Sequence, residues 1–237
     1  SYGRDLAVDG HRLPIFADLL HRVGEVEGIR RIRFTSPHPK DIRADVLKAM
    51  AETPAVCEQL HLPMQSGSRS ILRAMQRGYT PERYFEKLRM AEAMIPGLAT
   101  STDIIVGFPG ETEADFQATL DAVAEARFDG AFMFIYSPRA GTPAANMPNH
   151  VDRDVASERF SRLSVLQQRI SVEKNQALIG STVEVLSEGP SRKDPTMITA
   201  RTRTNKVVHV PGSHRSGTFF EAHIERASPS HLVGTAI

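Results

Sequence analysis

Short apolar runs alternate with amphipathic stretches through the first half of the chain. Apolar residues recur at helical spacing over residues 15–26, 42–51, 69–76 continuing through 82–94, and 113–126. Strand-like runs lie between them, at residues 31–35, 59–63, 101–107 and 131–137. Alternation of this kind predicts βαβ units with right-handed crossovers and a parallel sheet. Four strands are too few to close a barrel, so we expect an α/β fold with an open or incomplete sheet.

Two predicted helices start with residues that can satisfy the first backbone amides. Asp41 can cap a helix that begins at residue 42. Thr112, with Asp115 three positions later, can form a capping box. We therefore expect a helix to begin at each of these points.

The pattern changes after residue 150. Residues 151–178 read as one long helix, which Gly180 ends. Gly, Pro, Asn and Ser then separate short strands at residues 182–187, 197–202, 206–211, 218–225 and 231–233. These short strands predict a small antiparallel β-barrel. We expect a partial barrel domain over residues 1–150, a connecting helix over 151–179 and a small β-barrel over 180–237.

Composition places the chain among ordinary globular proteins. It has 237 residues, of which 41% are hydrophobic and 24% charged, and its formal net charge is +1. No apolar run reaches the roughly 20 residues of a membrane span, and no leader pattern opens the sequence. We therefore expect a cytoplasmic protein without membrane contact. The one cysteine, Cys57, excludes an intramolecular disulfide and a multi-cysteine metal site within these residues. We interpret Cys57 as structural.

The strand end Gln-Leu-His-Leu-Pro-Met-Gln-Ser-Gly-Ser at residues 59–68 is unusually polar. His61 stands between two leucines of the strand, and Gln65, Ser66 and Ser68 follow in the turn. A turn that only changes the direction of the chain needs one Gly or Asn. The extra His, Gln and Ser residues therefore predict an active site at the carboxyl edge of a parallel sheet.

A second strand end, at residues 102–111, has the same character. Asp103 near the start of an apolar strand is either a buried, paired carboxylate or a group that faces the interior of the barrel. Gly107 and Gly110 lie on either side of Phe108 and let the backbone approach a flat ligand. The segment lacks the spacing and the lysine of a phosphate-binding P-loop.

Other loop residues are candidate contacts for a substrate or an anion. His38 stands between two prolines, and we favour a site residue over a surface histidine in a rigid loop. Tyr136 and Arg139 follow the fourth strand, and Arg139 is either solvated or a clamp for phosphate or carboxylate. Arg77 is either an ordinary cation at a helix end or a second contact for an anion.

The predicted C-terminal barrel is modestly basic. Over residues 181–215 the acids are Glu184, Glu188 and Asp194, and the bases are Arg192, Lys193, Arg201, Arg203, Lys206 and Arg215. A basic β-barrel suits the phosphate backbone of a nucleic acid, and a solvated face is the alternative.

Taken together, these segments resemble the radical S-adenosylmethionine methylthiotransferases. The resemblance is carried by residues 33–40, 59–68, 75–79, 103–112 and 134–143. Residues 180–233 resemble the small RNA-binding TRAM barrel of that family. The resemblance implies a partial (β/α) barrel in which S-adenosylmethionine lies across the carboxyl ends of the strands. Thr-Ser-Pro-His-Pro at residues 35–39 is similar to the branch that modifies isopentenyladenosine, more than to the threonylcarbamoyladenosine and ribosomal-protein branches.

The resemblance also implies roles for individual residues. The implied contacts of S-adenosylmethionine are Gln65, Ser66, Ser68, Arg77, Asp103, Val106, Gly107 and Phe108. The implied contacts of the substrate are His38, His61, Tyr136, Arg139, Arg201, Arg203 and Lys206. The implied substrate is adenosine 37 in the anticodon stem-loop of a tRNA. The implied enzyme is a monomer that receives electrons from a separate donor.

One departure from the family pattern is decisive. The family uses a Cys-x3-Cys-x2-Cys loop for one [4Fe-4S] cluster and three further cysteines for a second, whereas this sequence has one cysteine. Residues 1–3 are similar to the end of a preceding barrel strand, so we expect the chain to begin inside the catalytic domain. The implied reaction is sulfur insertion and methylation at C2 of N6-isopentenyladenosine. We expect these residues alone to be inactive, and we assign no catalytic or metal-binding residue within them.

Two other classes of function remain open. A non-catalytic RNA-binding module would bind an anticodon stem-loop with strongly salt-dependent affinity and hold no iron. A metal-independent barrel enzyme would use His38, His61 and Asp103 as acid and base groups, and would turn over a substrate without iron or S-adenosylmethionine.

Overall fold

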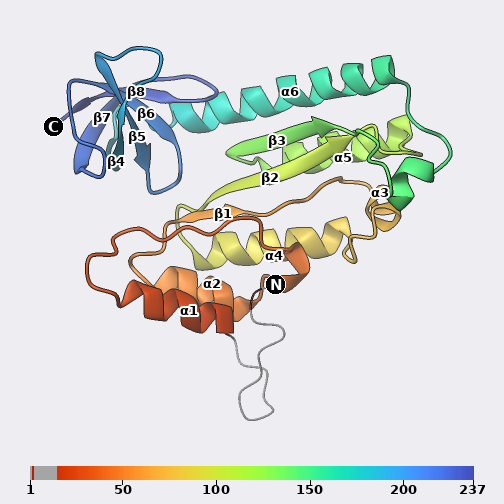
Figure 1. The fold of residues 1–237 in the computed structure, drawn as a ribbon, viewed down its shortest axis with the longest axis horizontal. Coiled ribbons are helices and arrows are strands. Elements are labelled where there is room, and N and C mark those ends of the chain that lie inside the picture. Colours follow the sequence, from red (N-terminus) through yellow and green to blue (C-terminus); the bar gives the residue numbers. More distant parts are fainter. Residues whose placement is uncertain (1, 3–14) are drawn as a thin grey trace, which may run out of the picture. The chain divides into compact units, whose positions relative to one another are not determined.

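The chain folds into two compact units, Ser1–Gln167 and Gln168–Ile237. The computed structural model describes residue 2 and residues 15–237 (Figure 1). Most of the strand end expected at residues 1–3 lies outside the described residues. The domain limits expected at residues 150 and 180 stay predictions.

The first unit contains a parallel sheet with the strand order β1-β2-β3. The strands are β1 (Gln59–His61), β2 (Ala99–Val106) and β3 (Gly130–Ile135). The helices before β2 are α1 (Ile15–Gly24), η1 (Pro39–Asp41), α2 (Ala44–Glu52), α3 (Arg69–Ala74) and α4 (Pro81–Met94). Those after β2 are α5 (Glu113–Ala126) and η2 (Pro143–Asn146). Helices alternate with parallel strands, so the predicted α/β architecture is confirmed.

The core of this unit lies between the sheet and its crossover helices. Along β2, Thr102, Ile104 and Val106 are buried, whereas Ser101, Asp103 and Ile105, which alternate with them, are partly exposed. Tyr84 of α4 donates a hydrogen bond from its phenol to the carbonyl of Leu62 at 2.7 Å. The ring of Tyr84 also meets that of Phe128, with 6.4 Å between centroids. These contacts bury one face of the sheet.

The prediction of a strand at residues 31–35 is wrong. Ile32 forms a single parallel bridge with Val56, and the ladder stops there. To continue, the ladder would need the carbonyl of Cys57 and the amide of Gln59 to bond with residue 34. These two groups bond to each other instead, at 2.8 Å. The backbone opposite residue 34 has therefore turned back on itself, and no partner is left for a longer strand.

The helix predicted to continue from residue 69 to residue 94 is interrupted. α3 ends at Ala74, because Gln76 and Gly78 adopt left-handed backbone with φ of 56° and 69°. Thr80 then caps α4, and its hydroxyl accepts a hydrogen bond from the Arg83 amide at 3.4 Å. The sequence between them forms a loop that the apolar periodicity does not reveal.

The two predicted helix caps have different outcomes. The Thr112 capping box is confirmed: the Thr112 hydroxyl accepts from the Asp115 amide, and the Asp115 carboxylate accepts from the Thr112 amide. Asp41 is not a helix cap. It lies in η1, and the extended backbone of Ile42 and Arg43 separates it from the start of α2.

The long predicted helix is confirmed as α6 (Arg153–Gln176), and the division between the two units falls within it. Gly180 follows with a φ of 82°. In the described part of the chain, no helix combines the length and the apolar character that crossing a bilayer requires.

The second unit contains a closed barrel with the strand order β4-β5-β6-β8-β7. Its strands are β4 (Thr182–Pro190), β5 (Met197–Thr202), β6 (Val207–Pro211), β7 (Phe219–Ala227) and β8 (Leu232–Ala236). Small aliphatic side chains, among them Val185, Val208 and Ile224, form its core. The small barrel is confirmed, but it is not wholly antiparallel: β8 lies between β7 and β6 and pairs in parallel with β6.

Candidate active site

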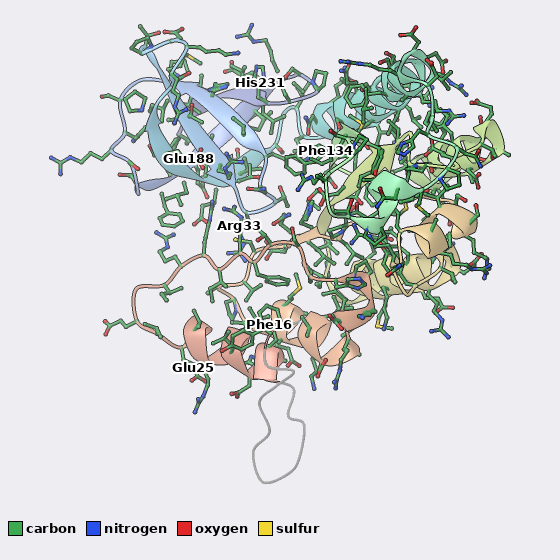
Figure 2. All side chains as sticks on the ribbon, turned by 45° about the vertical axis from the view of Figure 1, so that its right-hand side comes forward. Phe16, Glu25, Arg33, Phe134, Glu188 and His231 are labelled. Carbon is green, nitrogen blue, oxygen red and sulfur yellow. The ribbon has the colours of Figure 1, made fainter. Side chains whose placement is uncertain are left out.

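The face of the sheet opposite the core carries polar and aromatic side chains. Ser101 pairs in register with His61 of β1, and Asp103 pairs with Phe132 of β3. Phe132 is 61% exposed and Phe134 is 53% exposed, although both lie in a strand. Phe134 is labelled in Figure 2. We call the surface formed by His61, Ser101, Asp103, Phe132 and Phe134 the open sheet face.

Both ring nitrogens of His61 have partners on the open sheet face. Nε2 lies 3.2 Å from Oδ1 of Asp103, and Nδ1 lies 2.9 Å from the hydroxyl of Ser101. The ring of Phe132 meets the imidazole edge-on, with 5.7 Å between centroids. The Asp103 side chain remains 26% exposed. The structure therefore brings together two predicted site residues, His61 and Asp103, and leaves the Asp103 carboxylate partly exposed to solvent.

Gln65 joins the open sheet face to the turn after β1. Its φ of 70° is uncommon for a residue other than glycine. The Gln65 amide donates to the carbonyl of Asp103 at 2.8 Å, and its carbonyl accepts from the amide of Ile105 at 3.0 Å. Two hydrogen bonds to β2 thus hold this backbone in place beside Asp103.

Ser66 and Ser68 contact α5. The Ser66 hydroxyl lies 3.2 Å from that of Thr119, and the Ser68 hydroxyl donates to Asp115 at 2.5 Å. Gly67 packs so closely that an added Cβ would lie 2.4 Å from the carbonyl oxygen of Ala118. These contacts fix the turn against α5, and direct contact of the two serines with a cofactor stays a prediction.

Asp115 carries the charge in this cluster. Burial alone would raise its pKa, but hydrogen bonds from Ser68, Ser70 and Thr112 prevail and hold the pKa of Asp115 at about 2. Asp115 is therefore ionised at neutral pH, and it joins the start of α5 to the turn after β1.

The turn after β2 is held by a buried ion pair with α6. Arg159 donates from Nη1 to Oε1 of Glu111 at 2.8 Å and to the Glu111 carbonyl at 3.1 Å. The two side chains are 5% and 1% exposed. Burial raises the pKa of Glu111, while the Gly107 amide and Arg159 lower it. The sequence does not reveal Arg159 as a partner, because the contact joins residues far apart in the chain.

Three predicted cofactor residues and one predicted substrate residue meet beside α6. Val106 and Phe108 are buried, and a Cβ at Gly107 would lie 2.8 Å from that of Ala156. The ring of Tyr136 meets Phe108 edge-on at 5.2 Å between centroids. Within the described residues, the buried hydroxyl of Tyr136 has no hydrogen-bond partner. Because the Val106 side chain faces the core, only its backbone remains available to a ligand.

Arg77 and His38 lie next to Tyr79, at the carboxyl end of β1. The rings of His38 and Tyr79 meet edge-on, with 5.5 Å between centroids. The Tyr79 phenol donates to the carbonyls of Pro63 and Met64, at 3.1 and 3.0 Å. Burial raises the pKa of Tyr79 to about 12, and the nearby Arg77 acts in the opposite direction. The buried Nε of Arg77 has no hydrogen-bond partner among the residues that the structure describes.

The remaining predicted substrate residues are spread over two regions. Arg139 is exposed in the loop after β3, where its carbonyl accepts two hydrogen bonds from Thr142. Arg201, Arg203 and Lys206 share the β5–β6 hairpin of the second unit. Arg201 pairs with Glu188 at 2.7 Å, and Lys206 donates to Asn175 at 2.8 Å.

Cys57 is buried, and its amide donates to the carbonyl of Ile32 at 3.0 Å. Within the described residues, no three His, Cys, Asp or Glu side chains gather to hold a metal ion. A four-iron cluster is held by several thiolates, and these 237 residues contain one cysteine. The residues present therefore do not fit an iron–sulfur cluster.

Two family models match the chain. The Radical SAM superfamily model matches residues 10–123, and the TRAM domain model matches residues 176–237. The second match covers the closed barrel. The predicted combination of a radical SAM domain and a TRAM domain is therefore confirmed.

Curated relatives match nearly the whole chain. The tRNA-2-methylthio-N(6)-dimethylallyladenosine synthase of Moorella thermoacetica is 48% identical over 238 residues, which cover 100% of this chain and 53% of that protein. Its namesake from Thermoanaerobacter sp. (strain X514) is 54% identical over 90% of this chain and 44% of that protein. The one from Parafrankia sp. is 50% identical over 98% of this chain and 48% of that protein. The chain spans about half the length of these relatives. The chain is therefore similar to about half of each of these synthases, and it contains one region that matches the Radical SAM superfamily and one that matches the TRAM domain.

Proposed function

We propose that this chain is part of a tRNA methylthiotransferase that inserts sulfur and adds a methyl group at C2 of N6-isopentenyladenosine 37. The main support is its 48% and 54% identity to proteins named tRNA-2-methylthio-N(6)-dimethylallyladenosine synthase. The TRAM match further supports tRNA as the substrate.

The open sheet face suits S-adenosylmethionine, which when bound supplies the methyl group and the 5′-deoxyadenosyl group. The Asp103 carboxylate, oriented by His61, would accept hydrogen bonds from ribose hydroxyls or from the ammonium group. The exposed rings of Phe132 and Phe134 offer flat surfaces beside it. The sequence did not single out these two rings, although their spacing of two in a strand places them on one face.

The other predicted cofactor residues fall into two groups. Gln65 and Arg77 lie at the carboxyl end of β1, and the guanidinium of Arg77 suits the carboxylate of the methionine part. Ser66 and Ser68 would act indirectly, because they hold the turn against α5. Val106, Gly107 and Phe108 would contact the adenine through backbone.

The substrate side of the proposal follows the predicted residues. His38, His61, Tyr136 and Arg139 would line the modified nucleotide. Arg201, Arg203 and Lys206 would contact phosphates from the barrel. The enzyme would act as a monomer in the cytoplasm and receive electrons from a separate donor. Its two [4Fe-4S] clusters would take their ligands from residues other than these 237, which supply one cysteine.

The test of activity uses the polypeptide encoded by the complete reading frame that contains these residues, reconstituted with iron and sulfide. We expect a methylthio group on tRNA that carries N6-isopentenyladenosine, detected by mass spectrometry of the digested nucleosides. Modification of threonylcarbamoyladenosine or of a ribosomal protein instead would replace the proposed substrate. If the reconstituted polypeptide modifies none of the three, the proposed function is wrong.

Asp103→Asn in the same polypeptide tests the cofactor role of the open sheet face. We expect affinity for S-adenosylmethionine to fall about tenfold, because a charge-assisted hydrogen bond is lost. Isothermal titration calorimetry measures the change. Asp18→Asn removes an exposed carboxylate from α1 and serves as the control. Equal affinity of the two variants would exclude Asp103 as a contact.

A second function, RNA binding without catalysis, is favoured for these 237 residues on their own by their single cysteine. They would bind an anticodon stem-loop with salt-dependent affinity and retain no iron after reconstitution. Iron bound in stoichiometric amount would contradict this second function.

A further inference from the structure

A groove runs between α3 and the first turns of α4. One hollow of about 760 Å³ is lined by Arg69, Arg73 and Arg83, with Glu82 and Glu86. A second hollow of about 460 Å³ shares Arg69, Arg73 and Glu82 with the first. The two hollows adjoin each other along these residues, and we call them together the α3–α4 groove.

The α3–α4 groove is locally basic in a chain that is nearly neutral. Among the charged residues of its lining, three are arginines and two are glutamates, and two of the arginines lie on one short helix. Arg69 and Arg73 are four residues apart and so lie on the same face of α3. Arg83 comes from the first turn of α4. Three guanidinium groups therefore line the groove against two carboxylates.

Two of these guanidinium groups are not neutralised. Arg69 pairs with Glu82 at 2.9 Å. Arg73 and Arg83 are exposed and form no ion pair with any residue in the described part of the chain. Like charges that line one groove repel each other, and an anion bound between them removes that repulsion. Guanidinium groups bind phosphate oxygens in a bidentate manner.

The shape of the groove favours a polyanion over a small ion. A single phosphate would fill a small part of the 760 Å³ hollow. The one aromatic residue in its lining, Tyr79, is 8% exposed and hydrogen-bonded to backbone, so the groove offers no ring for a base to stack on. Guanidinium groups without a stacking ring suit the backbone of a nucleic acid and not its bases.

The groove also lies where a substrate would pass. Gly67 and Ser68, in the turn after β1, line its second hollow. Gln65 in the same turn is hydrogen-bonded through its backbone to Asp103 of the open sheet face. A strand of RNA seated in the groove would therefore run past the carboxyl end of β1.

We infer that the α3–α4 groove binds phosphodiester groups of the RNA substrate through Arg73 and Arg83. This inference rests on the proposed function, because it takes tRNA as the substrate. The contact is independent of base sequence, and it anchors RNA to the first unit in addition to any contact made by the barrel.

The experiment compares Arg73→Gln/Arg83→Gln with Arg22→Gln/Lys48→Gln in the full 237-residue chain. The second pair removes the same charge from exposed positions on α1 and α2. Binding of an anticodon stem-loop RNA is measured by fluorescence anisotropy at several salt concentrations. We expect the groove variant to bind about tenfold more weakly at low salt, with a slope of log affinity against log salt that is shallower by about 2. The control should match the wild type.

A second variant distinguishes the effect of charge on RNA binding from the effects of bidentate geometry and of misfolding. Arg73→Lys/Arg83→Lys keeps the charge but loses bidentate contact, so we expect the wild-type salt slope with weaker binding. Equal affinity and salt slope in the glutamine variant and the wild type would overturn the inference. So would displacement of the RNA by millimolar inorganic phosphate, or tighter binding of polyglutamate than of RNA.

The outcomes also distinguish this inference from the proposed function. If the groove variant binds RNA normally and the complete polypeptide still forms the methylthio product, the inference fails and the proposed function stands. If the groove variant loses RNA affinity while the complete polypeptide modifies no tRNA, the groove stands and the proposed function fails. A wild-type chain that binds no RNA contradicts the inference directly.

Discussion

Asp115 is the residue on which the turn after β1 depends. Its carboxylate accepts hydrogen bonds from Ser68 and Ser70 on one side and from Thr112 in the capping box on the other. One ionised side chain thus starts α5 and also positions the turn that carries Gln65. The backbone amide of Gln65 is hydrogen-bonded to the carbonyl of Asp103. A change at Asp115 that moves the turn would therefore also move the backbone beside Asp103 on the open sheet face.

We expect Asp115→Asn to lower the free energy of unfolding by about 1 kcal/mol at neutral pH, since a cap and two charge-assisted bonds weaken. The folded pKa of about 2 lies below the usual 3.8. The stabilisation by Asp115 is therefore present above about pH 4 and is lost as pH falls toward 2. Urea denaturation across this range should show a weaker pH dependence in the variant.

The control for this experiment removes a carboxylate from the same helix. Asp121 lies further along α5 and hydrogen-bonds Gln117 at the surface. We expect Asp121→Asn to change the free energy of unfolding by less than about 0.5 kcal/mol. Acid profiles of Asp115→Asn and wild type that run parallel would show that Asp115 does not carry the effect.

At this scale the sequence predicts some site residues better than others. The strand patterns suffice to place His61 and Asp103 at a sheet edge, and the two side chains do meet. The direction of Ser66 and Ser68 depends on Gly67 approaching α5, a contact between residues distant in the chain. Local sequence holds no information about that approach, so the serines could not be assigned to α5 in advance.

Among the elements, α6 contributes most to the turn after β2. Arg159 reaches Glu111, and Ala156 packs against Gly107 so closely that a larger residue at position 107 has no room. The guanidinium of Arg159 also lies 5.7 Å from the centre of the Phe116 ring in α5. The start of α6 therefore fixes the turn after β2, for which we propose contact with the adenine.

We expect Arg159→Met to lower the free energy of unfolding by about 3–5 kcal/mol, because it leaves Glu111 buried without its partner. Glu111→Gln/Arg159→Met should recover part of this loss, since no charge then remains buried. Arg162→Gln is the matched control, because Arg162 pairs with Glu113 and Glu158 at the surface. Chemical denaturation measures the free energy of unfolding of all three variants. Equal losses for Arg159→Met and Arg162→Gln would show that the buried ion pair does not stabilise the turn.

Two features of the fold differ from the sequence-based prediction: the strand expected at residues 31–35 and the break between α3 and α4. The apolar run at residues 31–35 resembles a strand, but the bond between Cys57 and Gln59 removes its partner. Gly78 indicates a break after α3, but the apolar periodicity of the surrounding residues favours a continuous helix. By contrast, β2, α5 and α6 could be predicted, because long periodic runs and a capping box mark them in the sequence itself.

At the scale of the whole molecule, each unit has its own core. The barrel buries Val185, Val208 and Ile224, among others, within its own strands. The end of α6 also belongs to this unit, where Asn175 donates to the carbonyl of Ser228 at 2.8 Å. A closed barrel whose core consists of its own residues can fold independently of the first unit.

We expect residues 168–237 to fold as a separate polypeptide and to unfold cooperatively in urea, as followed by circular dichroism. A shorter version that ends at residue 231 lacks β8 and should be unfolded, because β6 and β7 then have no common neighbour. A noncooperative transition in the longer fragment would show that the barrel depends on the first unit.

The position of β8 has a consequence for how the chain is made. Synthesis proceeds from the amino terminus, so β6 and β7 leave the ribosome before the strand that joins them. Until then both carry unpaired edges that can associate with other nascent chains. The five residues of β8 therefore complete the barrel, and the edges of β6 and β7 stay open until β8 pairs with both.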